Sequence, residues 1–425
     1  MWYNFIMKKV ICINKLRGTV QIPSDKSISH RAVMFTSLAN GRSVIKNFSK
    51  GQDPLSSLTI CNALGITHEF ADENTLIINS TGQLQAPQHE LYCGNSGTTM
   101  RLMAGILAGQ NFDSVLTGDE SLSKRPMKRI IEPLTMMGAK IEANGGLKIT
   151  GQLLQGIYYN SKLASAQVKS CILLAGLNAV GTTTFVEPYL SRNHTERMLQ
   201  FMGAQIFSTG NTTSIQKSTL QPKTIEIPGD ISSAAFFIAA GLIVPDSEII
   251  LKNVGLNPTR TGILEVGGEM GANIEVLDKR TVSGEEVGDL KIKSSELKGC
   301  MIEGDLIPRL IDELPVIAVL ATQAEGTTII RNAEDLRNKE SDRITAIVTE
   351  LKKLGADIEE TPDGFVINGK TTLKGGVQVE SYHDHRLAMS LYVAGLICEN
   401  PIEINGFDWV DVSFPEFESL FVKLL

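Results

Sequence analysis

Positively charged side chains stand at the expected starts of several helices, a pattern suited to binding anions. The segment Gly94–Arg101, GNSGTTMR, places two glycines, an amide and three hydroxyls just before an apolar run. The first turn of a helix has unpaired N–H groups and a positive dipole end, so it attracts anions. Similar clusters recur along the chain and carry these cations: Lys26, Arg31, Arg125, Arg192, Lys339, Arg343 and Arg386.

These cations predict one cleft for an anionic substrate. The formal net charge of the chain is −7, so an anion site has to be a local cluster of positive charge. If the fold points the helix starts at a common cleft, that cleft would bind one or two substrates with several negative charges. Each cluster taken alone fits an ordinary capped or solvated helix end equally well. The prediction therefore depends on the repetition of the clusters.

Two carboxylates in the same setting could transfer protons. Asp312 precedes Pro315 and a long apolar helix, and Glu340 lies between Lys339 and Arg343. A carboxylate that faces a cationic cleft is suited to general acid or base catalysis. The helix dipole also stabilises a carboxylate at a helix start, so a structural role stays open. We expect His194, a single histidine near a helix start, to be a hydrogen-bonded surface group.

Composition excludes several classes of protein. The acidic balance argues against a nucleic-acid binder. The six cysteines are scattered, with no CxxC pair and no Cys/His pair at metal spacing, which indicates reduced thiols, a cytoplasmic protein and no metal site. Apolar runs such as 234–244 are too short to span a bilayer. The start, MWYNFIMKKV, lacks the features of a signal peptide, and translation could begin at Met1 or at Met7.

A repeated unit organises the chain. Five times an amphipathic helix runs into a glycine and then into a short strand, as in LKKLGADIEE (351–360). The glycine is expected in the left-handed region at the helix C-terminus. Repeats at regular spacing indicate repeated supersecondary units. The glycines are Gly65, Gly138, Gly203, Gly271 and Gly355.

A sixth unit is expected to join the two ends of the chain. The segment 414–425, FPEFESLFVKLL, reads as an amphipathic helix, and its strands would come from residues 8–22. We therefore predict two similar α/β domains, each with three helix–strand units, that face each other across a cleft. One is discontinuous, residues 1–22 and 229–425, and the other is the insertion 23–228. The chain would cross between them near Pro23 and near Pro228.

Taken together, the motifs resemble a known enzyme family. DKSISHRA, GNSGTTMR, RPM, SAQVKS, SRNHTERML, PGDISSAAFF, IDELP, KESDR and DHRLAMS follow one another as in the 5-enolpyruvylshikimate-3-phosphate synthases. The resemblance implies two domains of the inside-out α/β barrel type with pseudo-three-fold symmetry. It implies transfer of the enolpyruvyl group of phosphoenolpyruvate to the 5-hydroxyl of shikimate 3-phosphate, with release of phosphate, on the pathway to chorismate and the aromatic amino acids. It implies no metal or organic cofactor, and we expect a monomer.

The resemblance also implies roles for individual residues. Against shikimate 3-phosphate it places Lys26, Ser27, Arg31, Ser165, Ala166, Gln167, Ser191, Arg192, Asp312 and Lys339. Against phosphoenolpyruvate it places Lys26, Gly94, Arg125, Gln167, Arg343 and Arg386. Asp312 would take the proton of the attacking hydroxyl, and Glu340 or Lys26 would protonate the methylene carbon.

Four features depart from the commoner pattern of the family. Many members have a lysine where this chain has Val412, a second serine at Ala166 and an asparagine at Asp335, and GNSGTT (94–99) replaces the commoner GNAGTA. These departures resemble the family's class with weaker sensitivity to glyphosate, whereas Gly94 is retained, which leaves sensitivity undecided. The sister transferase acting on UDP-N-acetylglucosamine would have a cysteine in Gly118–Arg125, and this loop has none. A non-catalytic anion-binding protein of the same fold would not depend on Asp312 or Glu340.

Overall fold

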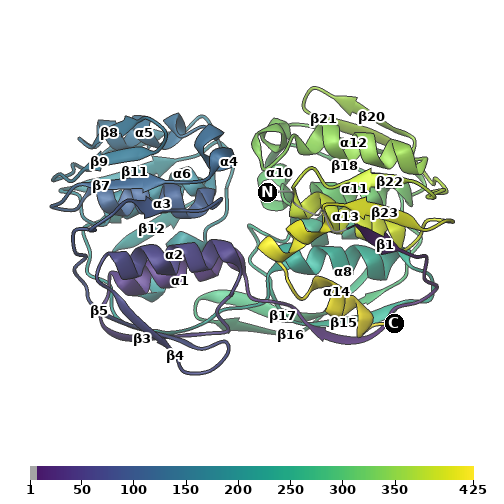
Figure 1. Cartoon of the computed structure of the whole chain (residues 1–425), viewed down its shortest axis with the longest axis horizontal. Helices are drawn as coiled ribbons and strands as arrows, with labels where there is room; N and C mark the ends of the chain where they lie inside the picture. The colour runs from purple at the N-terminus through teal and green to yellow at the C-terminus, as the bar shows by residue number, and fades with distance from the viewer. Residues whose placement is uncertain (1–6) are drawn as a thin grey trace. The chain divides into compact units, whose positions relative to one another are not determined.

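A computed structural model describes residues 7–425 and divides the chain into two compact units (Figure 1). Unit 1 contains the residues through Pro23, Gly229–Arg280 and Glu286–Leu425; unit 2 contains Ser24–Pro228 and Thr281–Glu285. The expectations about a signal peptide and about translation from Met1 concern residues outside the described range. No helix of the described residues is long and apolar enough to cross a membrane.

Unit 2 has three four-stranded sheets with the same strand pattern. In each sheet a short edge strand pairs in parallel with the second strand, and the remaining strands are antiparallel. The first sheet is β14 (Thr224–Glu226), β3 (Asn40–Lys46), β5 (Leu76–Thr81) and β4 (Thr67–Phe70). The second is β6 (Leu91–Tyr92), β7 (Ser114–Thr117), β9 (Leu147–Thr150) and β8 (Lys140–Ala143). The third is β10 (Tyr158–Asn160), β11 (Thr182–Val186), β13 (Thr212–Gln216) and β12 (Ile206–Thr209).

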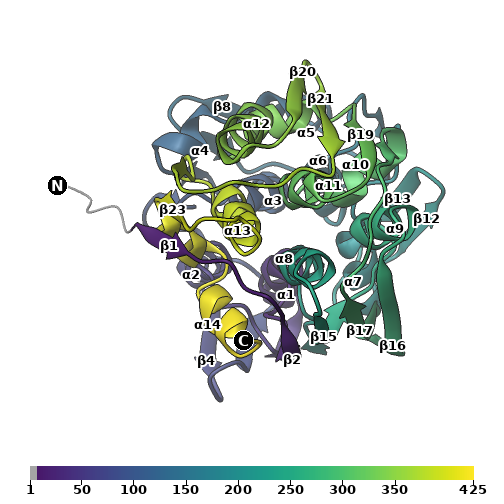
Figure 2. The same ribbon diagram turned by 90° about the vertical axis from the view of Figure 1, so that its right-hand side faces the viewer.

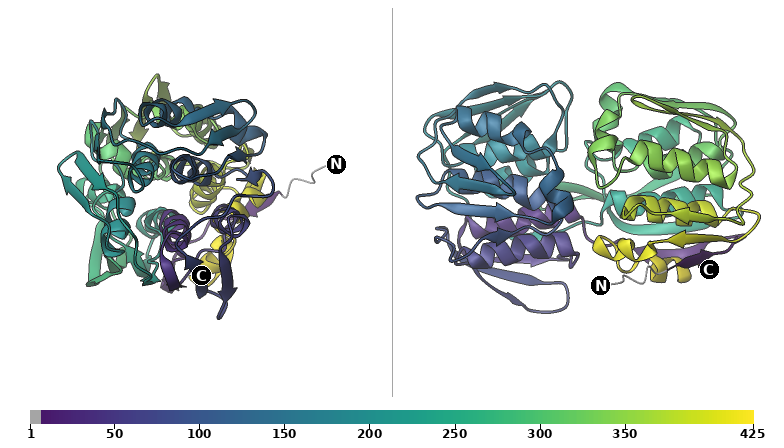
Figure 3. Two further views of the ribbon diagram at one scale, coloured as in Figure 1. Left: turned by 90° about the vertical axis from the view of Figure 1, so that its left-hand side faces the viewer. Right: turned by 45° about the horizontal axis from the view of Figure 1, so that its top comes forward.

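Helices fill the interior of unit 2 (Figure 3, left). The helices are α1 (Lys26–Ser37), α2 (Gln52–Ala63), α3 (Gly97–Ala108), α4 (Glu120–Lys124), α5 (Lys128–Met136), α6 (Ala166–Gly176) and α7 (His194–Phe201). Helices α3 and α6 are buried along nearly their whole length because their sequences are apolar on most sides. Gly105 of α3 lies directly against the backbone of Cys171 in α6, where a Cβ would meet a carbonyl oxygen at 2.1 Å.

Unit 1 repeats this arrangement with three sheets of its own. The first is β16 (Asn273–Val282), β17 (Glu285–Lys293), β15 (Glu248–Gly255) and β2 (Arg17–Gln21). The second is β18 (Met301–Ile302), β19 (Gly326–Ile330), β21 (Gly364–Gly369) and β20 (Ile358–Thr361). The third has three strands, β1 (Lys8–Val10), β23 (Ile402–Asn405) and β22 (Gln378–Glu380).

The core of unit 1 contains two helices that are apolar on every side, α8 (Ile231–Ile243) and α11 (Leu314–Thr322). The other helices of the unit are α9 (Gly262–Glu269), α10 (Ile307–Leu310), α12 (Arg343–Leu354), α13 (His385–Gly395) and α14 (Phe417–Val422), with 3-10 turns η1 (Gly304–Leu306), η2 (Glu334–Asn338) and η3 (Phe407–Val412). Every residue of α11 and α13 is buried. Figure 2 views α8, α11 and α13 nearly along their axes, with the strands of the unit around them. Helices inside and sheets outside are the inside-out α/β fold.

The predicted helix–glycine–strand repeat is confirmed. All five glycines have positive φ, between 82° for Gly271 and 101° for Gly355. Each glycine ends a helix and leads to the outermost strand of a sheet: β4, β8, β12, β16 and β20. A left-handed residue at this point reverses the chain at little cost only if it is glycine.

The prediction for the N-terminal segment is partly wrong. β1 completes the sheet of β22 and β23, as expected of a sixth unit. β2 instead pairs with β15 in a different sheet, so residues 8–22 serve two units of the repeat. The backbone of Arg17 also donates to the carbonyl of Leu424 at 2.8 Å, which ties the last helix to β2.

The tip of the β16–β17 hairpin belongs to unit 2, which the predicted boundaries did not include. His194 Nδ1 lies 2.7 Å from a carboxylate oxygen of Glu285, and Arg197 donates to the carbonyl of Gly284 at 3.2 Å. Both His194 and Glu285 are buried. His194 is therefore not the surface group expected from the sequence. Its partner lies 91 residues away in the chain, so no local pattern could predict the burial.

Candidate active site

In unit 2, hydrogen bonds tie the starts of several helices to one another. His30 of α1 lies 2.6 Å from the hydroxyl of Ser57 in α2, and that hydroxyl lies 2.8 Å from Thr99 in α3. Gln167 of α6 donates to the hydroxyl of Thr98 in α3 at 3.0 Å. Ser170 of α6 lies 2.7 Å from Thr195 in α7. The N-terminal halves of α1, α2, α3, α6 and α7 therefore lie together within unit 2.

Two guanidinium groups lie over the start of α3. Arg101 donates to the side-chain oxygen of Gln167, and Arg125 donates to that of Asn95. A Cβ added at Gly97 would lie 2.9 Å from Arg101 Nη1 and 3.3 Å from Arg125 Nη1. The glycine therefore leaves room for both cations beside the free N–H groups of the helix, which is an anion-binding geometry. Two of the residues expected at phosphoenolpyruvate, Arg125 and Gln167, are brought to this place.

The start of α1 holds the next group of predicted residues. Asp25 caps the helix by accepting from the backbone of Ile28 at 2.8 Å. Lys26 Nζ lies 3.1 Å from a carboxylate oxygen of Asp53, and both side chains are partly exposed. Arg31 is buried and donates to the hydroxyls of Thr195 and Ser170 at 2.7 and 2.8 Å. Arg31 thus helps to hold α6 and α7 against α1.

The remaining predicted residues of unit 2 lie beside helix starts. Ser165 is the N-cap of α6, followed by Ala166 and Gln167. Ser191 and Arg192 precede Asn193, the N-cap of α7. Ser191 is buried and Arg192 is partly exposed. Gly94 has φ of 61°, and a Cβ there would lie 3.3 Å from the hydroxyl of Ser56, so a larger residue would be strained.

In unit 1, Arg343 connects the acidic residues. Its side chain is 2% exposed, Nη1 lies 3.2 Å from Asp312 and Nη2 lies 2.7 Å from Glu340. Its Nε donates to Asp384 at 2.8 Å. Burial disfavours the charge, but Asp384, Glu340 and Asp312 outweigh burial and raise the pKa of Arg343 above its usual range. Arg343, a predicted ligand of phosphoenolpyruvate, therefore contacts both the predicted base, Asp312, and the predicted acid, Glu340.

Arg386 and Asp384 join two further helix starts to Arg343. Arg386 donates to the carbonyl of Ser232, in α8, at 2.9 Å, and its guanidinium carbon lies 5.8 Å from the centre of the Phe236 ring. Asp384 caps α13 by accepting from the backbone of Arg386 at 2.9 Å. Asp384 was not among the residues expected at the site, although an aspartate directly before a helix is a usual N-cap signal.

Lys339 and Val412 mark where this chain departs from the family pattern. Lys339 Nζ lies 2.8 Å from a carboxylate oxygen of Asp335, the residue that replaces the commoner asparagine. The pair is partly exposed. Val412 ends η3 and is partly exposed.

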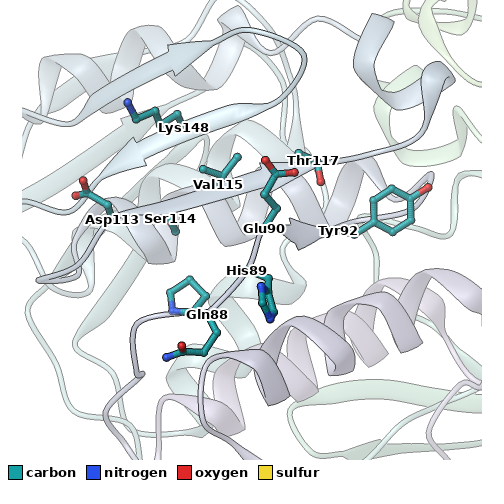
Figure 4. A pocket seen from close by; sticks show the side chains of 10 residues that line it. Gln88, His89, Glu90, Tyr92, Asp113, Ser114, Val115, Thr117 and Lys148 are labelled. Carbon is teal, nitrogen blue, oxygen red and sulfur yellow. The ribbon is translucent and has the colours of Figure 1, made fainter.

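A cavity of about 760 Å³ lies at the edge of the β6–β7 sheet and contains none of the predicted site residues (Figure 4). Gln88, His89, Glu90, Asp113 and Lys148 are among its lining residues.

The chemistry of the described residues gives no indication of a metal site. Within residues 7–425, no group of three or more His, Cys, Asp or Glu side chains is arranged to hold a metal ion.

Comparisons with known proteins find relatives that match nearly the whole chain. A family model described as EPSP synthase (3-phosphoshikimate 1-carboxyvinyltransferase) matches residues 10–421. The 3-phosphoshikimate 1-carboxyvinyltransferase of Bacillus licheniformis is 52% identical over 97% of this chain and 98% of its own length. That of Bacillus subtilis is 52% identical over 95% of this chain and 96% of its own length.

Solved structures show the same relationship. An EPSP synthase structure from Acinetobacter baumannii has a TM-score of 0.89 and 43% identity, and covers 98% of both chains. The enolpyruvyl transferase NikO from Streptomyces tendae has a TM-score of 0.78 at 18% identity, over 98% of this chain and 97% of its own, which shows the shared fold.

Proposed function

The chain belongs to the EPSP synthase (3-phosphoshikimate 1-carboxyvinyltransferase) family, and we propose that its two units are domains that each supply part of one active site. Unit 2 provides the helix starts of α1, α3, α6 and α7. Unit 1 provides the starts of α11, α12 and α13. The reaction transfers the enolpyruvyl group of phosphoenolpyruvate to the 5-hydroxyl of shikimate 3-phosphate. We propose that both substrates bind in a cleft between the domains.

The contact of Arg343 with both Asp312 and Glu340 is the observation that carries the mechanism. Asp312 and Glu340 share one guanidinium, which holds both carboxylates beside the place that we assign to phosphoenolpyruvate. Phosphoenolpyruvate brings negative charge to Arg343 and competes for its donors. Glu340, released from the guanidinium, is then placed to act as the acid that gives a proton to C3.

We propose that the reaction proceeds in two steps, an addition followed by an elimination. The 5-hydroxyl oxygen forms a bond to C2 of phosphoenolpyruvate while Asp312 takes the hydroxyl proton and Glu340, or Lys26, gives a proton to C3. The resulting tetrahedral intermediate carries a methyl group at C3. The group that protonated C3, now deprotonated, takes back one methyl proton while the C2–O bond to phosphate breaks, which restores the double bond and releases phosphate. Arg125, Arg343 and Arg386 would position phosphoenolpyruvate and stabilise the charge on the departing phosphate.

The other substrate would bind on the remaining helix starts. We assign the phosphate of shikimate 3-phosphate to Ser165, Ala166, Gln167 and Arg192, with Ser191 as the residue that precedes Arg192 and with Lys339 nearby. Ser27 and Arg31 would support the ring and its carboxylate. Free N–H groups at the start of α6 suit a phosphate.

A phosphate-release assay tests the function. We expect phosphate only when phosphoenolpyruvate and shikimate 3-phosphate are both present. Replacing shikimate 3-phosphate with UDP-N-acetylglucosamine should give none. Release with the sugar nucleotide would favour the sister activity, and no release with either acceptor would contradict a catalytic role.

We also propose that the enzyme acts as a monomer in the cytoplasm. Support for a reducing compartment comes from the cysteines, since all six are free and four are buried. Analytical ultracentrifugation with and without both substrates tests the oligomeric state.

A further inference from the structure

A buried lysine outside the expected site holds one of its segments in place. Lys169 of α6 is 1% exposed. Its ammonium lies 2.6 Å from Glu187, 2.8 Å from Glu196 and 3.1 Å from the carbonyl oxygen of Ser191. An ammonium has three protons to donate, so all three are used within the protein.

Glu187 continues the same network to Ser191. One carboxylate oxygen accepts from the backbone of Ser191 at 3.0 Å, and the other accepts from its hydroxyl at 2.6 Å. The N–H, the O–H and the C=O of Ser191 are therefore all bonded to Glu187 or Lys169. The five residues from Glu187 to Ser191 are closed into a ring at the point where the chain enters α7.

The hydroxyl of Ser191 has only one proton, and Glu187 accepts it. To donate to a phosphate, the hydroxyl would have to leave a buried carboxylate oxygen without that donor, which costs free energy. Loss of this donor would also leave the buried negative charge of Glu187 less well compensated when the phosphate is bound. Arg192, the next residue, is partly exposed.

We propose that Lys169 is a positioning residue for the binding of shikimate 3-phosphate. It fixes Glu187 and Ser191, and thereby directs Arg192 and the start of α7 toward the phosphate. Ser191 then acts as part of this support and not as a donor to phosphate. The proposal rests on the assignment of the phosphate to the start of α6 and to Arg192. Lys169 also neutralises one of the two buried carboxylates, Glu187 and Glu196.

The test compares Lys169→Met with Lys162→Met, an exposed lysine just before α6. Titration calorimetry measures the Kd for shikimate 3-phosphate, and steady-state kinetics measures KM for each substrate and kcat. For Lys169→Met we expect the Kd and KM for shikimate 3-phosphate to rise about tenfold to a hundredfold, since small misplacements of binding groups have effects of this size. The KM for phosphoenolpyruvate and kcat should change less than about threefold. Lys162→Met should match the wild type.

A second variant covers the case in which Lys169→Met does not fold. Glu187→Gln keeps the shape and leaves Lys169 paired with Glu196, but its amide cannot accept from both donors of Ser191. We expect the same split between the two substrates, with a smaller loss for shikimate 3-phosphate. Equal losses for both substrates, or an unchanged Kd for shikimate 3-phosphate in a folded variant, would overturn the inference. A wild-type enzyme without turnover would instead overturn the proposed function.

Discussion

Asp384 and Arg343 form a buried ion pair in which Nε lies 2.8 Å from Oδ2, and their side chains are 0% and 2% exposed. The other oxygen of Asp384 accepts from the backbone of Arg386 at 2.9 Å. One carboxylate thus holds two arginines that we assign to phosphoenolpyruvate. A residue with no expected contact to substrate therefore sets the geometry of the site.

Asp384→Asn should weaken phosphoenolpyruvate and spare shikimate 3-phosphate. The amide keeps an oxygen for the backbone of Arg386 but loses the charge that fixes Arg343. Losing a charged hydrogen bond costs about 1.5–3 kcal/mol, so KM for phosphoenolpyruvate should rise roughly tenfold to a hundredfold. The exposed Asp305→Asn is the control. Equal effects on both substrates would show a general loss of structure.

Asp312→Asn should reduce turnover far more than binding. The substitution keeps the size of the side chain and removes its capacity to take the hydroxyl proton. General base catalysis contributes about 10²–10⁴-fold, and kcat should fall within that range. The Kd for shikimate 3-phosphate, measured by calorimetry, should change only a few-fold. An unchanged kcat would exclude Asp312 as the base.

Asp335→Asn should strengthen the binding of shikimate 3-phosphate. The Lys339–Asp335 pair is partly exposed, so breaking it costs at most about 1 kcal/mol of stability. Lys339 would then no longer be held by a carboxylate and would be available to the substrate. We expect a Kd lower by a factor of about two to five, within the same 1 kcal/mol. A higher Kd in isothermal calorimetry would contradict this role of Asp335.

His30 should make the protein less stable in mild acid. Burial, followed by the charges of Lys26 and Arg31, lowers the pKa of His30 well below its usual value. The unfolded chain binds a proton near pH 6.5, but the folded chain does so only at lower pH. The free energy of unfolding should therefore decrease below about pH 6.5, by up to about 1.4 kcal/mol per pH unit from this residue.

Urea unfolding of the wild type and His30→Gln between pH 7.5 and 5 measures this effect. The variant has nothing to protonate at this position, so its stability should depend less on pH even if it is less stable overall. Parallel pH profiles for the two proteins would show that His30 does not contribute.

The sequence predicted those features that depend on local signals. Gly355 and its four counterparts end helices in the left-handed region because no other residue does so cheaply. Ser96 caps α3 at the predicted helix start, and its hydroxyl accepts from Thr99 at 3.1 Å. Apolar character on every side of α8 and α11 likewise indicated buried helices.

Contacts between distant residues could not be predicted in this way. Lys169 looked like one polar residue in an apolar helix, and its partner Glu187 gave no local sign of pairing. His194 is buried beside Glu285, which lies at the tip of the β16–β17 hairpin, 91 residues further along the chain. Such pairs depend on how units of the repeat pack, and neither spacing nor composition records that packing.

The most direct test of the central claim compares one arginine from each unit in steady-state kinetics. Arg125 lies in unit 2 and Arg386 in unit 1, and we assign both to phosphoenolpyruvate. In Arg125→Ala and in Arg386→Ala, KM for phosphoenolpyruvate should rise about tenfold or more, as expected for a lost charged hydrogen bond. The exposed Arg42→Ala should have no effect. If only one of the two arginines affects phosphoenolpyruvate, or if both affect shikimate 3-phosphate equally, the two units do not form one site for this substrate.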